Sequence, residues 1–184
     1  MTQSSYRLRP YDADTDQDAL WALKRQFERG IGSDTGGEEK ATTYDRKLTD
    51  EYRERYLEWV DRCVAESPTV VTVAEVAGER DRGADGRSAD GGESPLVGYV
   101  FLLPESLAMI WDGAVLNELF VAEAHRGTGV ADELLEASLS VASEQDLPID
   151  RLLLDVDGEN DRARAFYRRF GFEQWGGMVC RPLE

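Results

Sequence analysis

A strand, a short glycine turn and a helix follow one another in the second half of the chain, and this run constrains the fold more than any other feature. The segment Val115–Val121 is mainly apolar and has the length of a strand. After the turn, an amphipathic segment that extends to about Gln145 keeps its apolar side chains on one helical face. The segment Leu152–Val156 then has the composition of another strand. Because a helix connects the two strands, we expect them to pair in parallel.

The turn itself reads Arg126-Gly127-Thr128-Gly129, and its glycines let the backbone pass close to a ligand. The first N–H groups of a helix have no intrahelical acceptor and lie at the positive end of its dipole, so a phosphate or pyrophosphate fits there. No Gly-Lys-Ser/Thr of a Walker loop follows, and the segment is not a dinucleotide GxGxxG. A glycine pair at this place is compatible with a phosphate-binding loop and with a purely structural strand–helix turn.

The N-terminal part of the chain begins with an expected strand and helix. Tyr6–Arg9 alternates as a half-buried strand does. Thr15 and Asp18 have the spacing of a capping box at the start of a helix. The apolar residues on one face of that helix are Leu20, Leu23 and Phe27.

A glycine-rich, acidic segment, Gly30–Glu39, is expected to be a loop. A second helix is expected from about Tyr44, and Pro68 marks its end. The aromatic residues of this helix fit core packing better than a pocket lining. They include Tyr52, Tyr56 and Trp59.

The middle of the chain is expected to contain two strands, Val70–Val76 and Leu96–Leu103. Between them, residues 78–94 have no apolar period and are dense in Gly, Asp and Arg, so we expect a mobile loop and not a domain linker. Trp111-Asp112-Gly113 is a hairpin-type turn signal before the next strand. At 184 residues the chain suits a single domain, residues 1–184.

The chain is strongly acidic, with a net charge of −16 from 37 acidic and 21 basic residues. Such a chain should repel nucleic acid and anionic membrane, so we expect neither as a partner. The charge has two interpretations: attraction of polyamines or basic peptides, and adaptation to high salt, where the Debye length falls to about 3 Å at 1 M. We favour a halophilic protein, because the acidic residues are scattered over nearly every segment.

Cysteine and histidine are too sparse for a metal centre. Cys63 and Cys180 lack metal or redox spacing, and His125 is the only histidine, so we expect no metal site and no Ser-His-Asp triad. No charged-then-apolar signal segment opens the sequence, and no apolar run approaches the roughly 18 residues of a membrane span. We therefore expect a cytoplasmic protein.

A second motif follows the strand Leu152–Val156 and reads NDRARAFYRRFGF over residues 160–172. The order strand, Arg-x-x-Gly-x-Ala, helix, strand, Asn-x-x-Ala-x-x-x-Tyr-x-x-x-Gly-Phe resembles the GCN5-related N-acetyltransferase (GNAT) superfamily. The resemblance extends from Leu116 to Phe172. It implies a GNAT-like fold of mixed α/β (α+β) class, with a central mixed sheet of six to seven strands flanked by about four helices.

The resemblance also implies acetyl-CoA as co-substrate and places its binding site. Backbone groups of the glycine turn would hold the pyrophosphate, and Arg126 would either contact phosphate or cap the turn. Main-chain groups of the preceding strand would bond the pantetheine arm, and Asn160 would contact the cofactor, act as a helix N-cap, or do both. The residues assigned to the cofactor are Leu119, Phe120, Val121, Arg126, Gly127, Thr128, Gly129, Val130, Ala131 and Asn160.

Acyl transfer to an amine needs a proton for the departing thiolate and a neutral nucleophile. Tyr167 matches the family tyrosine that serves as general acid, and a phenol with a pKa near 10 is protonated at neutral pH. Glu118, a charge inside an otherwise apolar strand, is the leading candidate for the base, and Asp155 on the next strand is the second. Either carboxylate could instead be a structural partner. His125 adjoins the phosphate loop and is interpreted as a turn residue.

These observations predict an acetyl-CoA-dependent N-acetyltransferase of the 2.3.1 class of acyltransferases. It would transfer acetyl to a primary amine of a small molecule or peptide by direct attack in a ternary complex. The alternative is a catalytically inactive acyl-CoA-binding regulatory module on the same fold, which would not need Tyr167. A third possibility is a scaffold in which the glycine turn is only structural. The acceptor, a homodimeric state and the use of longer acyl groups stay open.

Overall fold

The computed structural model describes residues 6–34, 37–77, 96–178 and 181. The expected loop over 78–94 lies outside these residues. The helices are α1 (Gln17–Asp34), α2 (Gly37–Arg46), α3 (Asp50–Glu66), α4 (Glu105–Ala108), α5 (Val130–Ala142) and α6 (Asp161–Arg169), with a 3-10 turn, η2, at Glu123–His125. The strands are β1 (Tyr6–Pro10), β2 (Val71–Val76), β3 (Leu96–Leu102), β4 (Gly113–Val121) and β5 (Ile149–Leu154).

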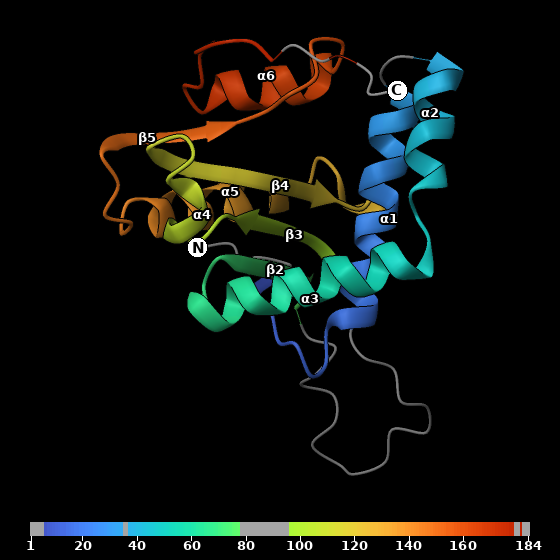
Figure 1. Cartoon of the computed structure of the whole chain (residues 1–184), viewed down its shortest axis with the longest axis horizontal. Coiled ribbons are helices and arrows are strands. Elements are labelled where there is room, and N and C mark those ends of the chain that lie inside the picture. Colours follow the sequence, from blue (N-terminus) through green and yellow to red (C-terminus); the bar gives the residue numbers. More distant parts are fainter. Residues whose placement is uncertain (1–5, 35–36, 78–95, 179–180, 182–184) are drawn as a thin grey trace.

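The strands form one mixed sheet in the order β1-β2-β3-β4-β5 (Figure 1). The first four are antiparallel neighbours, and β5 joins β4 in parallel. The predicted fold class and the parallel pairing are confirmed. The predicted number of strands was too high and that of helices too low, because the described part has five strands and six α-helices. Residues 173–178 add no strand after α6.

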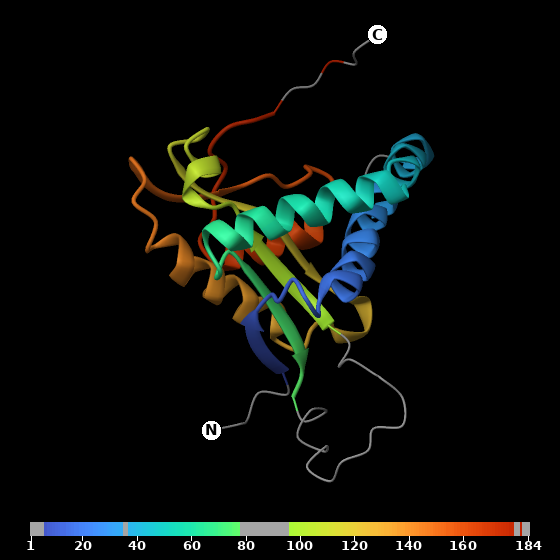
Figure 2. The same cartoon turned by 60° about the horizontal axis from the view of Figure 1, so that its bottom comes forward.

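Helices cover both faces of the sheet (Figures 1 and 2). On one face, α1 and α3 pack against β3, where the Phe101 ring lies 4.9 Å from that of Trp59. On the other face α5 lies so close that a Cβ on Gly98 would come within 3.2 Å of the Leu134 side chain. Tyr99 and Phe101 are fully buried at the centre of this core. The sheet is therefore a rigid platform between the two helical layers.

The expected loop Gly30–Glu39 was wrong for most of its length. Helix α1 continues to Asp34, and α2 begins at Gly37. Glycine costs only about 1 kcal/mol in a helix interior, which the flanking residues can outweigh. The acidic Glu38 and Glu39 occupy the first turn of α2, where they complement the helix dipole.

The single helix expected from about Tyr44 is divided in the structure. Helix α2 ends at Arg46 and α3 starts at Asp50, while Pro68 follows its end as predicted. The division falls at Thr49, whose side chain accepts the N–H of Tyr52 at 3.2 Å as an N-cap. Periodicity across this cap concealed the break.

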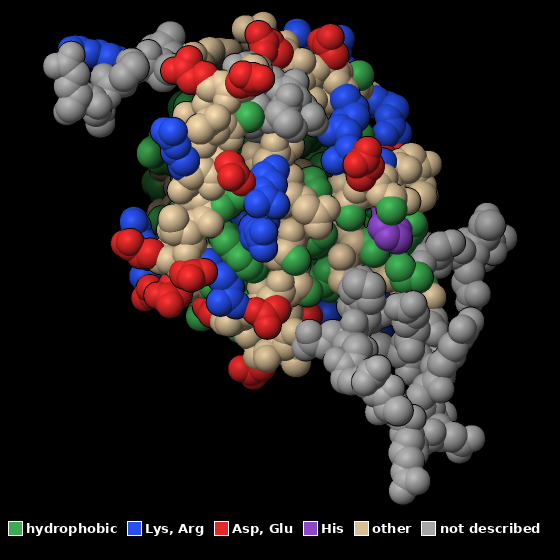
Figure 3. Space-filling model, turned by 90° about the vertical axis from the view of Figure 1, so that its right-hand side faces the viewer, with side chains coloured by type: hydrophobic (Ala, Val, Ile, Leu, Met, Phe, Trp, Pro, Cys, Tyr) green, Lys and Arg blue, Asp and Glu red, His purple; other side chains and the backbone are tan. Residues whose placement is uncertain are grey.

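Charged side chains of both signs are interspersed over the face shown in Figure 3. None of the helices among the described residues has the length and apolar character needed to cross a membrane.

Candidate active site

The central feature of the candidate site is an opening between β4 and β5. Their pairing ends at Leu116 and Leu154, whereas β4 stays paired with β3 as far as Val121. Figure 1 shows β4 continuing toward α1 while the chain after β5 rises toward α6. The backbone of β4 beyond Leu116 is thus not paired with β5, and its edge faces the opening. The predicted pantetheine residues Leu119, Phe120 and Val121 lie on this edge.

A β-bulge lies where the two strands separate. Leu102 pairs with Leu116 and Phe101 with Glu118, so Asn117 is an extra residue in β4. A bulge bends its strand and redirects the neighbouring side chains. Here the residue redirected toward α1 and α3 is Glu118.

The glycine loop lies directly beyond this edge. Gly127 has a φ of 75° and Gly129 a φ of 94°, a region that favours glycine. A Cβ at either position would meet no atom within 4 Å, so the surface above both is open. Arg126 Nε donates to the Val121 carbonyl at 3.2 Å, and Thr128 Oγ1 donates to that of His125 at 2.7 Å. The loop is therefore fastened to the end of β4.

The backbone donors of the loop are available to a ligand. Gly129 is the N-cap of α5 and supplies no side-chain cap. In the described part of the chain, none of the N–H groups from Gly127 to Ala131 donates a hydrogen bond. Unpaired donors at the positive end of a helix dipole form an anion site. The residues present therefore fit the pyrophosphate of a coenzyme A.

Tyr167 lies on α6 beyond the opening. Its ring packs between Phe166 and Phe172, with centroid distances of 5.2 and 5.5 Å. Burial raises the pKa of Tyr167 to about 12, so the hydroxyl keeps its proton at neutral pH. No hydrogen bond of this hydroxyl occurs within the described residues. Tyr167 thus offers a proton donor with no competing acceptor in the described part of the chain.

The other two predicted residues near β5 occupy different positions. Asn160 is the N-cap of α6, and its side chain accepts the N–H of Ala163 at 3.0 Å. The structure thus contains the N-cap; the cofactor contact stays a prediction. Asp155 directly follows β5 and is exposed to solvent.

Glu118 is the centre of a buried polar cluster. Only 4% of its surface is exposed, and Lys24 Nζ lies 2.6 Å from Oε1. The hydroxyls of Tyr56 and Tyr99 donate to Oε2 at 3.0 and 2.6 Å. Asn117 Nδ2 also donates to Oε1, at 3.2 Å. The carboxylate is consequently held by donors on both oxygens, and it would have to exchange one of them to accept a proton.

Lys24, Tyr56 and Tyr99 were not predicted from the sequence as members of this cluster. Lys24 could have been found, because it lies on the apolar face of α1, four residues after Leu20. A charge on such a face requires a buried partner. The tyrosines gave no comparable signal, since aromatic residues are ordinary in a core.

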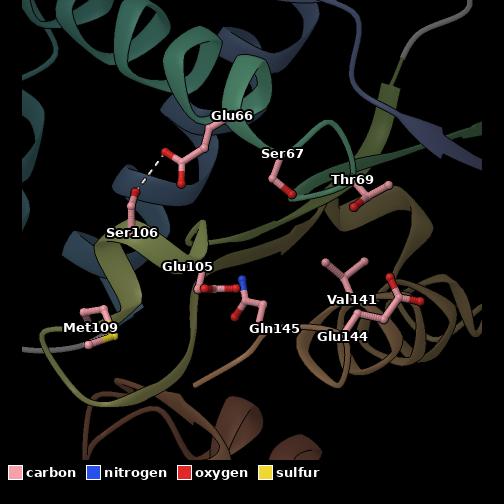
Figure 4. A pocket seen from close by; sticks show the side chains of 9 residues that line it. All are labelled: Glu66, Ser67, Thr69, Glu105, Ser106, Met109, Val141, Glu144 and Gln145. Atoms are coloured by element: carbon pink, nitrogen blue, oxygen red, sulfur yellow. Dashed lines mark hydrogen bonds between the residues drawn. The ribbon is translucent and has the colours of Figure 1, made fainter. Parts of the chain in front are cut away.

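A separate cavity of about 500 Å³ lies at the C-terminal ends of α3 and α5 (Figure 4). Ser106 Oγ donates to Glu66 at 2.8 Å across its rim. The cavity contains none of the predicted site residues. It is lined by Glu66, Ser67, Thr69, Glu105, Ser106, Met109, Val141, Glu144 and Gln145.

The sequence profile of the acetyltransferase (GNAT) family matches residues 39–172. The match spans most of the chain, including the opening, the glycine loop and α6. The chain therefore belongs to the GNAT family of acetyltransferases, whose acetyl donor is acetyl-CoA. No curated protein matches the chain in sequence.

Solved structures of acetyltransferases share the fold. The PaiA N-acetyltransferase of Thermoplasma acidophilum, in complex with coenzyme A, superposes with a TM-score of 0.64 at 18% identity, over 92% of this chain and 90% of that one. A GCN5-related N-acetyltransferase of Ralstonia eutropha gives 0.61 at 15% identity, over 97% and 98%. Ard1 of Thermoplasma volcanium gives 0.57 at 20% identity, over 94% and 85%. At these identities the likeness concerns the fold.

Proposed function

We propose that this protein is an acetyl-CoA-dependent N-acetyltransferase that acetylates a primary amine of a small molecule or peptide in a ternary complex. The observation that carries the proposal is the continuity of two backbone surfaces. The edge of β4 beyond Leu116, which is not paired with β5, leads directly into the N–H groups of Gly127–Ala131, which donate to no acceptor among the described residues. A long ligand with an extended amide arm and a pyrophosphate fits such a continuous strip.

Donor binding on this strip depends on the backbone. The N–H groups of the glycine loop hold the pyrophosphate, and the positive end of the α5 dipole adds attraction. Leu119, Phe120 and Val121 direct the arm along β4 toward the bulge at Asn117. The thioester would then lie between the bulge and α6.

Tyr167 is the general acid in this proposal. Its phenol protonates the thiolate as the bond between carbonyl carbon and sulfur breaks. Two observations support this role: the pKa is raised, and the hydroxyl has no acceptor among the described residues.

Glu118 is the proposed base and takes the proton that the amine loses. A lysine-like amine with a pKa near 10.4 is neutral in only about one molecule in 2,500 at neutral pH, a cost of about 4.6 kcal/mol. An α-amine near 7.7–8.0 costs only about 1–1.4 kcal/mol. The base therefore matters most for amines of the first class. Asp155, exposed after β5, is the alternative base.

Two measurements test the function. Acetyl-CoA should raise the melting temperature more than ADP does, because only the former also covers the β4 edge. Release of free thiol from acetyl-CoA should then depend on an added amine, in a panel of amino acids, polyamines, aminoglycosides and peptides. Stabilisation by acetyl-CoA without turnover of any amine would favour a binding module, and equal stabilisation by both nucleotides would contradict the arm site.

A further inference from the structure

Lys24 occupies an unusual position for a lysine. It lies on α1, is 4% exposed, and its Nζ is 2.6 Å from Glu118 Oε1 and 2.6 Å from Glu28 Oε1. The ammonium also lies over the rings of Tyr56 and Phe27, at 4.7 and 5.1 Å from their centroids. Two carboxylates and two aromatic faces thus surround one buried cation.

Charges of opposite sign alternate outward from the bulge of β4. Glu118 contacts Lys24, Lys24 contacts Glu28, and Glu28 Oε2 lies 2.6 Å from Lys47 Nζ. Lys47 is partly exposed, so the row runs from the core to the surface. The row is neutral as a whole, which offsets much of the cost of burying its members.

The ammonium of Lys24 is stable in this row. Burial by itself would lower the pKa of Lys24, but Glu118 and Glu28 outweigh it, and the pKa is raised. Burial would likewise raise the pKa of Glu28, but Lys24 and Lys47 outweigh it. Both groups are therefore charged at neutral pH.

The cluster also lies next to the point where β4 and β5 separate. Glu118 follows the bulge residue Asn117 and lies two residues beyond Leu116, where β5 leaves β4. The groups that face its carboxylate are Lys24 from α1, Tyr56 from α3, Tyr99 from β3 and Asn117 from β4. Lys24 is the cation among them, and removing it would leave a buried carboxylate with neutral donors only.

We propose that Lys24 is a positioning residue for acetyl transfer, whose shared ammonium holds the carboxylate of Glu118 in place beside the opening between β4 and β5. This inference rests on the proposed function, in which Glu118 is the base. When Glu118 accepts the amine proton it loses its charge, and Glu28 at the same 2.6 Å distance remains as the partner of Lys24. The buried cation is thus never left without a carboxylate during the reaction.

The test is the pH dependence of kcat/KM with the amine that reacts fastest in the panel. Burial favours a neutral carboxyl, and Lys24→Met removes the cation that opposes this effect. The acidic limb of the kcat/KM profile should therefore move upward by about one pH unit or more. At pH values below the limb, turnover should fall about tenfold or more. Lys24→Arg, which keeps the charge, should leave the limb in place. Affinity for acetyl-CoA should change by less than about threefold in both variants, since the donor strip is separate.

Glu28→Gln is the matched control within the cluster. It removes a carboxylate but keeps the contact between Lys24 and Glu118, so its acidic limb should not move upward. If the limb of Lys24→Met coincides with that of the native protein, the inference is overturned. Glu118→Gln distinguishes a failure of the positioning role from a failure of the proposed function. Near-native turnover in that variant would overturn Glu118 as the proposed base.

Folding of the variants is checked by circular dichroism. Should Lys24→Met fail to fold, Lys24→Gln makes the same test, since its amide donates to Glu118 without a charge. If neither neutral variant folds, Lys24 is a requirement of the fold and the positioning role is overturned.

Discussion

The candidate site has two halves: a donor-binding strip formed by backbone groups, and a buried cluster of side chains around Glu118. The donor strip along β4 and the glycine loop is made of backbone, and the residues from Gly127 to Gly129 are exposed. The Glu118 cluster is made of side chains from α1, α3, β3 and β4, and its centre is buried. A site formed by backbone groups tolerates many substitutions but few changes of backbone conformation. A cluster of side chains, in contrast, is sensitive to the substitution of its members. Substitutions should therefore separate donor affinity from acceptor-side chemistry and stability.

The largest expected effect is that of Tyr167→Phe, a substitution on α6 that belongs to neither half. Phenylalanine keeps the ring packing on Phe166 and Phe172 and removes only the hydroxyl group with its proton. We expect kcat to fall by about 10²–10⁴-fold, with little change in acetyl-CoA affinity. Single-turnover kinetics measures the chemical step directly.

Tyr11→Phe is the control for this substitution. Tyr11 follows β1, which is at the opposite edge of the sheet from β5, and its hydroxyl donates to Asp61 at 3.2 Å. Its removal should leave kcat close to native. A Tyr167→Phe variant with near-native single-turnover rates would mean that another group protonates the thiolate.

The next largest effect is on the free energy of unfolding, and it tests the cluster around Glu118. Glu118→Ala leaves Lys24 buried with Glu28 alone and two tyrosine hydroxyls without their acceptor. Breaking a buried pair in this way costs about 3–5 kcal/mol of unfolding free energy. Denaturant unfolding of Glu118→Ala beside Asp155→Ala, an exposed carboxylate, measures the difference. Equal stability of the two variants would contradict the cluster as an anchor of α1 and α3.

Salt should act on the surface more than on either half of the site. A net charge of −16 repels itself most at low ionic strength, while buried pairs are screened little. We expect melting temperature and activity to rise between about 50 mM and about 2 M salt. An enzyme that is as active and as stable at the lower concentration would favour the alternative of a polycationic substrate.

The smallest expected effect is an absence of change at alkaline pH. The folded pKa of Tyr167 is raised to about 12, so its proton stays in place throughout the neutral and mildly alkaline range. Because the raised pKa belongs to the folded state, any stability that it contributes is lost only as pH rises from about 10 toward 12. A limb in kcat near pH 8 to 9 that disappears in Tyr167→Phe would contradict the raised pKa of this half-buried phenol.

The same contrast explains what the sequence could reveal. The strand, glycine loop, α5 and β5 were predicted because their signals are local and consecutive. The position of Tyr167 on α6 followed from the spacing after Asn160. The cluster around Glu118 was not predicted, because Lys24, Tyr56 and Tyr99 come together only through packing of distant elements. The break at Thr49 was missed because the helical period continues across it.

The most direct test of the account is a calorimetric titration of acetyl-CoA into Gly129→Val, Gly37→Val and Lys24→Arg. Gly129 and Gly37 both have positive φ and open space around an added Cβ, so the two valine variants carry similar backbone strain. The account predicts that only Gly129→Val loses affinity, by about tenfold or more, because its side chain occupies the anion site. Native affinity in a folded Gly129→Val protein, or an equal loss in Gly37→Val, would contradict a donor site built on the loop backbone.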